Sequence, residues 1–540
     1  MKFTHKALLT AALGLAVAGP ALADDDSSAL FADAAGPVEA AAPAAAAAEP
    51  AGSGFTLGLS GSHEFGYHLP AYNGDSFNYD SEMKAPYFSN ELDITVQDKD
   101  VKLVSNWDAT LKPLRADSTN EYGSYDGSWG KLAKIKPLEN YISWSPKGWK
   151  LAAGYQIFSW GVADKKNPTD NLNPRDYSVG VNADKIPALA ADAIWYPTDS
   201  VSVEGVFEPA AQDSIYPVDF TGEADAGAGS LDASIASKYA ALKAYGYAGY
   251  GSTVAASDIA FEPKNSILGA KVNYRSSSFD ASLSYLYDID PLYTPIVAVS
   301  YTKYGSYTVP SGVDISLERE RIHRFGFDAK TTVGKYGLWT EVCYSLTKNS
   351  GSDDYEYRRS KLDYVLGGDV NFGPNDTGYV NFQYFGTWIP GYDDSFYEDL
   401  YAGKITDPTE VYQRALVENL GLDTEGLLQG VTTNLKWELL DGALTPQVTG
   451  VFAVPFNYDK KNGSNQDLKR YCSLALTPEI DWKPVDSFHI KLGADLAYAW
   501  AKQGDGDVKF DTASDKIGVY TPSNNLYLKV LYKWNYDLKK

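Results

Sequence analysis

The chain has 540 residues, a formal net charge of -23 and two cysteines. So acidic a protein is not expected to bind nucleic acid, because a phosphate backbone attracts basic surfaces, and it offers neither a disulfide framework nor a zinc motif. Aromatic residues make up 14% of the chain, with 40 Tyr and 12 Trp. This composition suits a membrane interface, where one end of each side chain is apolar and the other is wet.

The N-terminus has the features of a secretory signal. Lys2 and Lys6 precede a short apolar stretch that ends in a small-residue cleavage site at Ala23. We therefore expect a signal peptide over 1–23, cleaved after Ala23. Residues 24–54 are rich in Ala and Pro and predict a disordered periplasmic lead-in. No later segment has ~18 consecutive apolar residues, so no transmembrane helix is expected.

From Phe55 onward the dominant pattern is an alternation of apolar and polar residues. A period of two places alternate side chains on opposite faces of a β-strand. The pattern is clearest in the last segment, 525–538, whose apolar face ends in aromatics, as a lipid-facing strand of a transmembrane barrel requires. That face comprises Leu526, Leu528, Val530, Tyr532, Trp534, Tyr536 and Leu538.

The same alternation predicts about 18 strands over 55–540, with 16 or 20 as open alternatives. Short turns follow the even-numbered strands and long segments follow the odd-numbered ones, which is the layout of a bacterial outer-membrane barrel. We predict an all-β fold, a closed transmembrane antiparallel β-barrel with short periplasmic turns and long extracellular loops. The predicted strands are 55–69, 88–98, 101–112, 137–146, 149–160, 188–197, 200–208, 266–276, 279–289, 319–331, 336–348, 360–372, 376–388, 426–439, 443–456, 470–482, 487–501 and 525–538.

Alternation also assigns charged side chains to the lumen. Charges of both signs predict a hydrated channel, and in general porins a basic wall faces acidic loop residues, which creates a transverse field. The alternative for segment 317–324 is an exposed strand end that carries ion pairs. The principal predicted wall charges are Lys271, Arg275, Glu320, Arg324, Asp328 and Lys330. Further predicted lumen charges are Glu91, Asp93, Lys102, Asp108, Glu204, Asp363, Asp369, Lys491, Asp495, Lys529 and Lys533.

The two cysteines are assigned by the same rule. Cys343 is predicted to point inward and Cys472 outward. A disulfide between them would have to cross the barrel wall, so both are expected to be free thiols.

Segment 158–177 is the most distinctive of the chain. It contains two Asn-Pro turns, each followed two residues later by Asp. Asn and Asp side chains cap such turns and Pro fixes φ, so the segment predicts an ordered loop at the outer end of the fifth strand.

In this segment the chain resembles porin-like outer-membrane barrel families, in which a strand of the form Gly-x-Gln-x-x-x-Trp-Gly runs into an Asn-Pro-x-Asp loop near the lumen. The matching residues are Gly154, Gln156, Trp160, Gly161, Asp164, Asn167, Pro168, Asp170, Asn173, Pro174, Arg175 and Asp176. Elsewhere the resemblance is only architectural. One departure is the end of the chain, Asp537-Leu538-Lys539-Lys540, which lacks the C-terminal Phe that many proteobacterial barrels present to the assembly machinery.

The resemblance implies that this loop folds into the barrel and narrows the pore. The alternative is a surface loop that is stabilised by its own turns. The residues implied for the pore constriction are Trp160, Asp164, Asn167, Asp170, Asn173, Arg175 and Asp176.

Two other long segments, 209–265 and 389–425, each predict a short helix. One covers 234–245, and the other covers 408–420 with Asp407 as its cap. Either segment could fold inward as a partial plug or stay outside as a binding surface, and the sequence does not choose between them.

No catalytic motif stands out. His489 and Ser487 share a face, but no third partner is evident, and no metal site or cofactor is expected. We therefore predict a non-enzymatic outer-membrane porin that lets small hydrophilic solutes diffuse through a loop-constricted lumen. The alternatives are a substrate-selective transporter and an adhesin or surface-structural barrel. The expected partners are outer-membrane lipid, the permeating solutes and the barrel-assembly machinery. A homotrimer is common among porins, but nothing in the sequence marks a subunit interface.

Overall fold

The structure is a computed structural model. It describes residues 55–70, 86–111, 133–177, 183–215, 224, 228, 252–256, 262–304, 307–348, 358–392, 395–405, 407–419, 426–455, 472–502, 508–510 and 516–539. The predicted signal peptide (1–23), the lead-in (24–54) and the predicted helix at 234–245 lie outside these residues.

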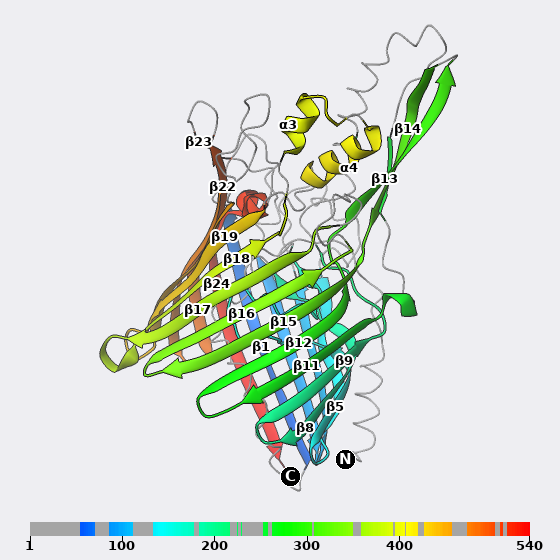
Figure 1. Cartoon of the computed structure of the whole chain (residues 1–540). Coiled ribbons are helices and arrows are strands. Elements are labelled where there is room, and N and C mark those ends of the chain that lie inside the picture. Colours follow the sequence, from blue (N-terminus) through cyan, green and yellow to red (C-terminus); the bar gives the residue numbers. More distant parts are fainter. Residues whose placement is uncertain are drawn as a thin grey trace.

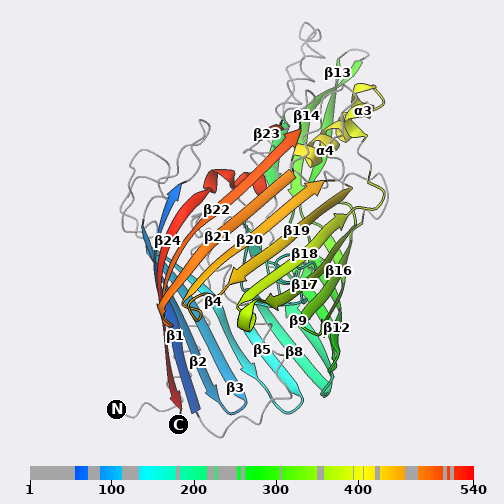
Figure 2. The same ribbon diagram turned by 90° about the vertical axis from the view of Figure 1, so that its left-hand side faces the viewer.

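Eighteen antiparallel strands form one closed barrel (Figures 1 and 2). Closure is achieved by β1, which pairs with β2 on one side and with the last strand, β24, on the other. A transmembrane sheet needs this closure because a bilayer offers no hydrogen bonds to a free strand edge. In order round the barrel the strands are β1 (Phe55–Pro70), β2 (Tyr87–Asp98), β3 (Val101–Leu111), β4 (Ala133–Trp144), β5 (Trp149–Gln156), β8 (Ala188–Thr198), β9 (Val201–Glu208), β11 (Ile267–Arg275), β12 (Phe279–Ile289), β15 (Arg321–Val333), β16 (Tyr336–Leu346), β17 (Lys361–Phe372), β18 (Gly378–Trp388), β19 (Leu427–Trp437), β20 (Leu444–Pro455), β21 (Cys472–Val485), β22 (Phe488–Lys502) and β24 (Asn525–Lys539).

All the predicted strands are present, and the predicted fold class is confirmed. Most boundaries differ by no more than three residues, and two differ by four, each for a physical reason. The fourth strand begins at Ala133 rather than 137, because Pro137 lies at a register shift in the pairing of β3 with β4, where a missing N–H is tolerated. The fifth strand ends at Gln156 rather than 160, because Phe158 donates its N–H to Asn173 Oδ1 instead of to a neighbouring strand.

The barrel presents large apolar side chains outward and polar ones inward. On β24, Leu526, Leu528 and Tyr532 are 41–47% exposed, whereas Tyr527 and Lys529 between them are at most 3% exposed. Aromatic side chains near the short-turn rim extend the outer apolar surface, as a membrane interface requires. They include Trp144, Trp149, Trp195, Trp437 and Trp482. Among the described residues no helix is both long and apolar enough to cross a membrane.

Both cysteines are free, as predicted, and both are buried. Cys343 lies on the inner face, where the side chain of Asn171 contacts its sulfur. Cys472 belongs to the other set of alternating residues on β21, opposite in parity to the inward Glu479 and Asp481.

Several elements lie outside the barrel wall. A hairpin of β13 (Thr294–Tyr304) and β14 (Tyr307–Glu318) extends beyond the long-loop rim, and β10 (Ser252–Ala256) pairs in parallel with β14 (Figure 1). The predicted strands 279–289 and 319–331 leave 290–318 as a long loop, and this prediction is wrong. Pro295 and Pro310 weaken the strand signal there, and Pro310 is accommodated beside a register shift.

The predicted helix at 408–420 is confirmed as α4 (Pro408–Asn419), and Asp407 Oδ1 accepts the N–H of Thr409 at 3.0 Å, as a helix cap does. Helix α4 packs on the β13–β14 hairpin, where Tyr412 and Leu416 are fully buried. This part of segment 389–425 therefore lies beyond the barrel rim. The remaining elements are β6 (Arg175–Asp176), β7 (Asp184–Lys185), β23 (Val508–Phe510), α3 (Phe396–Tyr401), η4 (Pro263–Asn265), η5 (Pro374–Asp376) and η6 (Lys516–Ser523).

Candidate functional site

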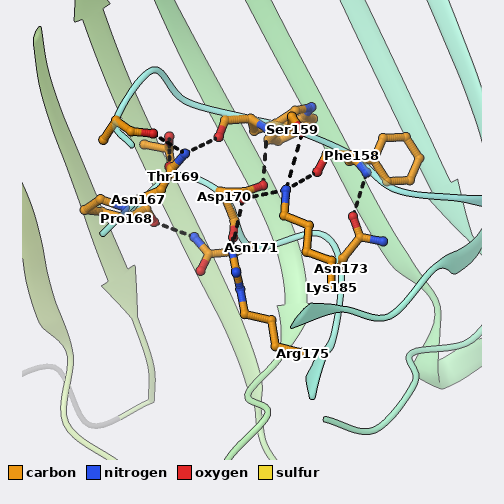
Figure 3. A network of polar contacts seen from close by, with 12 residues as sticks. Phe158, Ser159, Asn167, Pro168, Thr169, Asp170, Asn171, Asn173, Arg175 and Lys185 are labelled. Carbon is orange, nitrogen blue, oxygen red and sulfur yellow. Dashed lines mark hydrogen bonds and ion pairs between the residues drawn. The ribbon is translucent and has the colours of Figure 1, made fainter. Parts of the chain in front are cut away.

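The chain leaves the wall after β5 and rejoins it at β8, and the described residues between, 157–177 and 183–187, lie against the inner face of the barrel. We call this segment the inner loop. Its described residues contact inward-facing side chains on β9, β11, β16 and β18. Figure 3 shows the polar contacts that hold it together. Its position follows from side-chain chemistry, because the inner wall offers both an apolar patch and buried acceptors.

The base of the inner loop is anchored by apolar packing. Phe158, Trp160 and Leu172 form one buried cluster with inward-facing wall residues. The indole N–H of Trp160 donates to Glu204 Oε1 at 3.1 Å, so the polar end of the ring is also satisfied. The wall members of the cluster are Ala190, Val206, Ile267 and Leu286, and the cluster is completed by Ala211, which follows β9, and by Ile289, the last residue of β12.

Asp170 is the centre of a buried charge network in the loop (Figure 3). Its carboxylate lies 2.9 Å from Arg175 Nη2 and 2.6 Å from Lys185 Nζ, and it accepts the N–H of Trp160. Burial lowers the pKa of Lys185, while the charge of Asp170 opposes that shift. Lys185 also donates to the carbonyl of Phe158. One acid is therefore shared by two bases, and the network carries a net positive charge.

The two Asn-Pro turns close the loop on itself. Asn173 Oδ1 accepts the N–H of Phe158 at 2.6 Å, and its Nδ2 donates to the carbonyls of Gln156 and Ile186. Asn167 Nδ2 donates to the carbonyl of Trp160 at 3.0 Å. The Asn side chains thus satisfy backbone groups that have no strand partner.

The tip of the inner loop, residues 161–169, reaches strands far from β5. Glu341 on β16 accepts the N–H groups of Val162, Ala163 and Thr169 and the hydroxyl of Thr169. On β18, Gln383 Oε1 accepts the N–H of Lys165 at 3.0 Å.

Asn381 on the same strand donates to Asp164 Oδ2 at 2.9 Å. Burial raises the pKa of the Asp164 carboxyl, Lys165 opposes this shift and Asp369 adds to it. Glu341, Asn381 and Gln383 were not predicted as partners of the loop. Alternation places them inward, but it does not reveal which loop they meet.

Asp176 and Arg175 form β6, which pairs with β7. Lys136 Nζ on β4 lies 3.7 Å from Asp176 Oδ2, and Tyr520 in η6 donates its hydroxyl to the carbonyl of Tyr177 at 2.7 Å. The returning half of the inner loop is therefore also tied to β4 and to η6.

The predicted wall charges lie on the inner face but are paired along the wall. Arg324 Nε is 3.0 Å from Asp288 Oδ2, and Lys271 Nζ is 3.9 Å from Asp328 Oδ2 and 5.8 Å from the ring centroid of Trp160. Arg324 is therefore ion-paired, but in a buried position on the inner face and not at an exposed strand end, because its guanidinium is held by Asp288 on the neighbouring strand.

The other predicted wall charges lie near the rims. Glu320 precedes β15 and accepts the N–H of Arg358 at 2.9 Å. Lys330 and Arg275 lie at the short-turn end, where both approach Asp280 at 3.9 and 3.8 Å. No group of metal-ligating side chains is found among the described residues.

No protein-family model matches the chain, and no curated protein sequence is significantly similar to it. The solved structures that it is similar to include OpdK of Pseudomonas aeruginosa with vanillate, at 8% identity over 89% of this chain and 99% of that chain, with a TM-score of 0.45. They also include OccAB4 of Acinetobacter baumannii, at 8% identity over 89% and 98%, with a TM-score of 0.45. The outer membrane channel DcaP of Acinetobacter baumannii shares 11% identity over 90% and 99%, with a TM-score of 0.36. The overlap is partial at these TM-scores, so the function proposed below depends on the geometry of this chain alone.

Proposed function

We propose that the protein is a bacterial outer-membrane channel through which small hydrophilic solutes diffuse, and that the inner loop narrows its lumen. The observation that carries this proposal is the attachment of residues 157–177 to the inner wall by buried contacts, with Glu341 as the main polar anchor on the wall and the Asp170 network holding the loop together. A barrel of ~16–18 strands is wide enough to enclose water, so a loop fixed inside it is expected to set the narrowest cross-section.

The outer apolar surface and the aromatic rim residues support a location in the outer membrane. In that location the short turns would face the periplasm and the β13–β14 hairpin the outside. The inward face supports a hydrated path, because charged residues of both signs recur on it. No chemical step and no cofactor is part of this proposal.

The test is single-channel conductance of refolded protein in a planar bilayer, with the reversal potential in a salt gradient. Steady conductance is the expected result. Reversing the charge of Arg175 to Glu and of Asp170 to Lys is expected to shift the cation-to-anion permeability ratio in opposite directions, because both belong to the inner loop. Asp486→Lys, in the exposed β21–β22 turn, is the control. A heat-modifiable, β-rich barrel without conductance would contradict the proposal.

A second candidate is a surface-binding role, which the β13–β14 hairpin favours. With α4 it has its own buried cluster, including Leu317 and Tyr412 at 0% exposure. Such a unit can hold a defined shape beyond the rim. Two results together would favour this adhesin role. The barrel would not conduct, and it would bind cells or matrix only while the hairpin is present. A substrate-selective channel would instead show conductance that one class of solute blocks.

A further inference from the structure

The tip of the inner loop converges on one carboxylate. Glu341 has no solvent exposure and accepts four hydrogen bonds from the tip, three from backbone N–H groups and one from the Thr169 hydroxyl. Gly161 makes this approach possible. Its φ is +91°, and a Cβ atom there would lie 2.5 Å from Glu341 Oε1. The tip is thus folded around the carboxylate.

The base and the tip are held in different ways. The base is held by apolar packing of Phe158, Trp160 and Leu172 and by the loop's own Asp170 network. The tip meets the far wall mainly through hydrogen bonds to Glu341, Asn381 and Gln383, with only Ala163 at the edge of an apolar cluster. Water can replace hydrogen bonds more readily than it can replace buried apolar contacts.

We propose that Glu341 is a latch for the channel: a positioning residue that holds the loop tip against β16 and β18, from which the tip can detach while the base stays folded. This inference rests on the proposed function, because the position of the tip would then set the width of the lumen. Loss of the latch is expected to increase the population of a wider pore rather than to unfold the barrel.

The chain contains a natural reporter for this movement. Cys343, the next inward-facing residue on β16, is 2% exposed, and Asn171 Nδ2 of the loop lies 3.9 Å from its sulfur. Loop residue Thr169 also packs beside Gly326 on β15, which is the residue that pairs with Cys343 on β16. Detachment of the tip should therefore expose the Cys343 thiol to a reagent in the lumen.

The experiment measures the labelling rate of Cys343 by a charged, membrane-impermeant methanethiosulfonate in the folded full-length barrel, with Cys472 replaced by Ala. Glu341→Gln is expected to raise the rate about tenfold, the change in open population that accompanies a loss of ~1.4 kcal/mol. Thr169→Val, which removes only the hydroxyl donor, is expected to give a smaller rise. The matched control is Glu479→Gln, a buried inward carboxylate on β21 that bonds Gln447 and Tyr527 rather than the loop.

Unchanged labelling in both latch variants, with heat-modifiability intact, would overturn the proposal, as would an equal rise in Glu479→Gln. If Glu341→Gln does not fold, the Cys343 labelling rate of Thr169→Val tests the latch instead: a rise supports it and an unchanged rate overturns it. Conductance separates this inference from the proposed function. A barrel that never conducts but shows the rise in labelling would reject the channel and keep the latch, whereas normal conductance without the rise would reject the latch alone.

Discussion

Trp160 packs directly over Gly269: a Cβ atom on Gly269 would lie 2.9 Å from Cη2 of Trp160 and 3.4 Å from a methyl group of Leu172. The absence of a side chain on β11 is therefore part of the docking surface for the inner loop. A barrel strand ordinarily loses stability by carrying glycine, and here the missing side chain leaves the space that a buried tryptophan occupies.

Gly269→Val should displace Trp160 and loosen the base of the inner loop. Overpacking of this kind costs about 1–3 kcal/mol, and the cost falls on the loop because the strand is held by its neighbours on both sides. The measurement is the rate at which a small charged methanethiosulfonate labels Cys343 in the folded barrel with Cys472 replaced by Ala, which we expect to rise about tenfold. Gly205→Val, where a Cβ meets no atom within 4 Å, should leave the rate unchanged. Equal rates in the two variants would show that Trp160 does not hold the loop.

Asn171→Cys should form a disulfide with Cys343. The side-chain nitrogen of Asn171 is 3.9 Å from the Cys343 sulfur, so a thiol at position 171 can approach bonding geometry with a small shift. Oxidation is expected to fix the loop two residues beyond its tip and to reduce fluctuations of the single-channel current, and a reductant is expected to restore them. Mass spectrometry of the cross-linked peptide checks the bond. Two thiols that stay free under oxidation would show that residue 171 does not lie beside Cys343.

Glu320 should make the stability of the barrel depend on pH. Burial raises its pKa from 4.5 to about 7, assisted by Asp290 and opposed by Arg358 and Lys348. The folded state therefore holds a proton that the unfolded state releases between about pH 4.5 and 7, so stability falls as pH rises through this window.

Glu320→Gln is expected to remove this loss, which amounts to roughly 3 kcal/mol at pH 8. The midpoint temperature of heat-modifiability should rise in the variant at pH 8 and match the wild type at pH 4.5. Glu318→Gln changes an exposed carboxylate two residues away and serves as the control. A gain that is equal at both pH values would mean that Glu320 is ionised throughout.

Leu492→Lys should impair assembly in the membrane. Leu492 is 58% exposed on the outer face of β22, and a basic residue facing lipid near the midplane costs about 2–4 kcal/mol. Thr477→Lys places the same side chain on the inner face of the adjacent strand β21 and should assemble normally. The measurement is the fraction of heat-modifiable barrel recovered from membranes. Equal recovery of the two variants would argue that β22 does not face lipid.

The strands were predictable because each contains a complete local signal. On β24 the alternation from Leu526 to Leu538 specifies both the strand and its faces, because every strand of the closed barrel needs one apolar outer face and one polar inner face. The β13–β14 hairpin was missed because its packing partner, α4, is about a hundred residues away in the chain, and prolines mask its alternation.

The inner loop was predictable only in part. Its Asn-Pro turns predicted an ordered loop, since the bonds made by Asn167 and Asn173 are local. The contact between Thr169 and Glu341 joins residues 172 positions apart. Nothing in the sequence around Thr169 specifies Glu341 as its partner, and nothing around Glu341 specifies Thr169. The contact can therefore be identified only once the strands are arranged in space.

The inner loop begins at β5, and its tip is attached to β18. Round the barrel β8, β9, β11, β12, β15, β16 and β17 lie between these two strands. The loop contacts β9, β11, β15, β16 and β18 in turn. It therefore lines one arc of the wall and links strands that are hydrogen-bonded only to their nearest neighbours, so these strands cannot shift past one another without also moving the segment that sets the lumen.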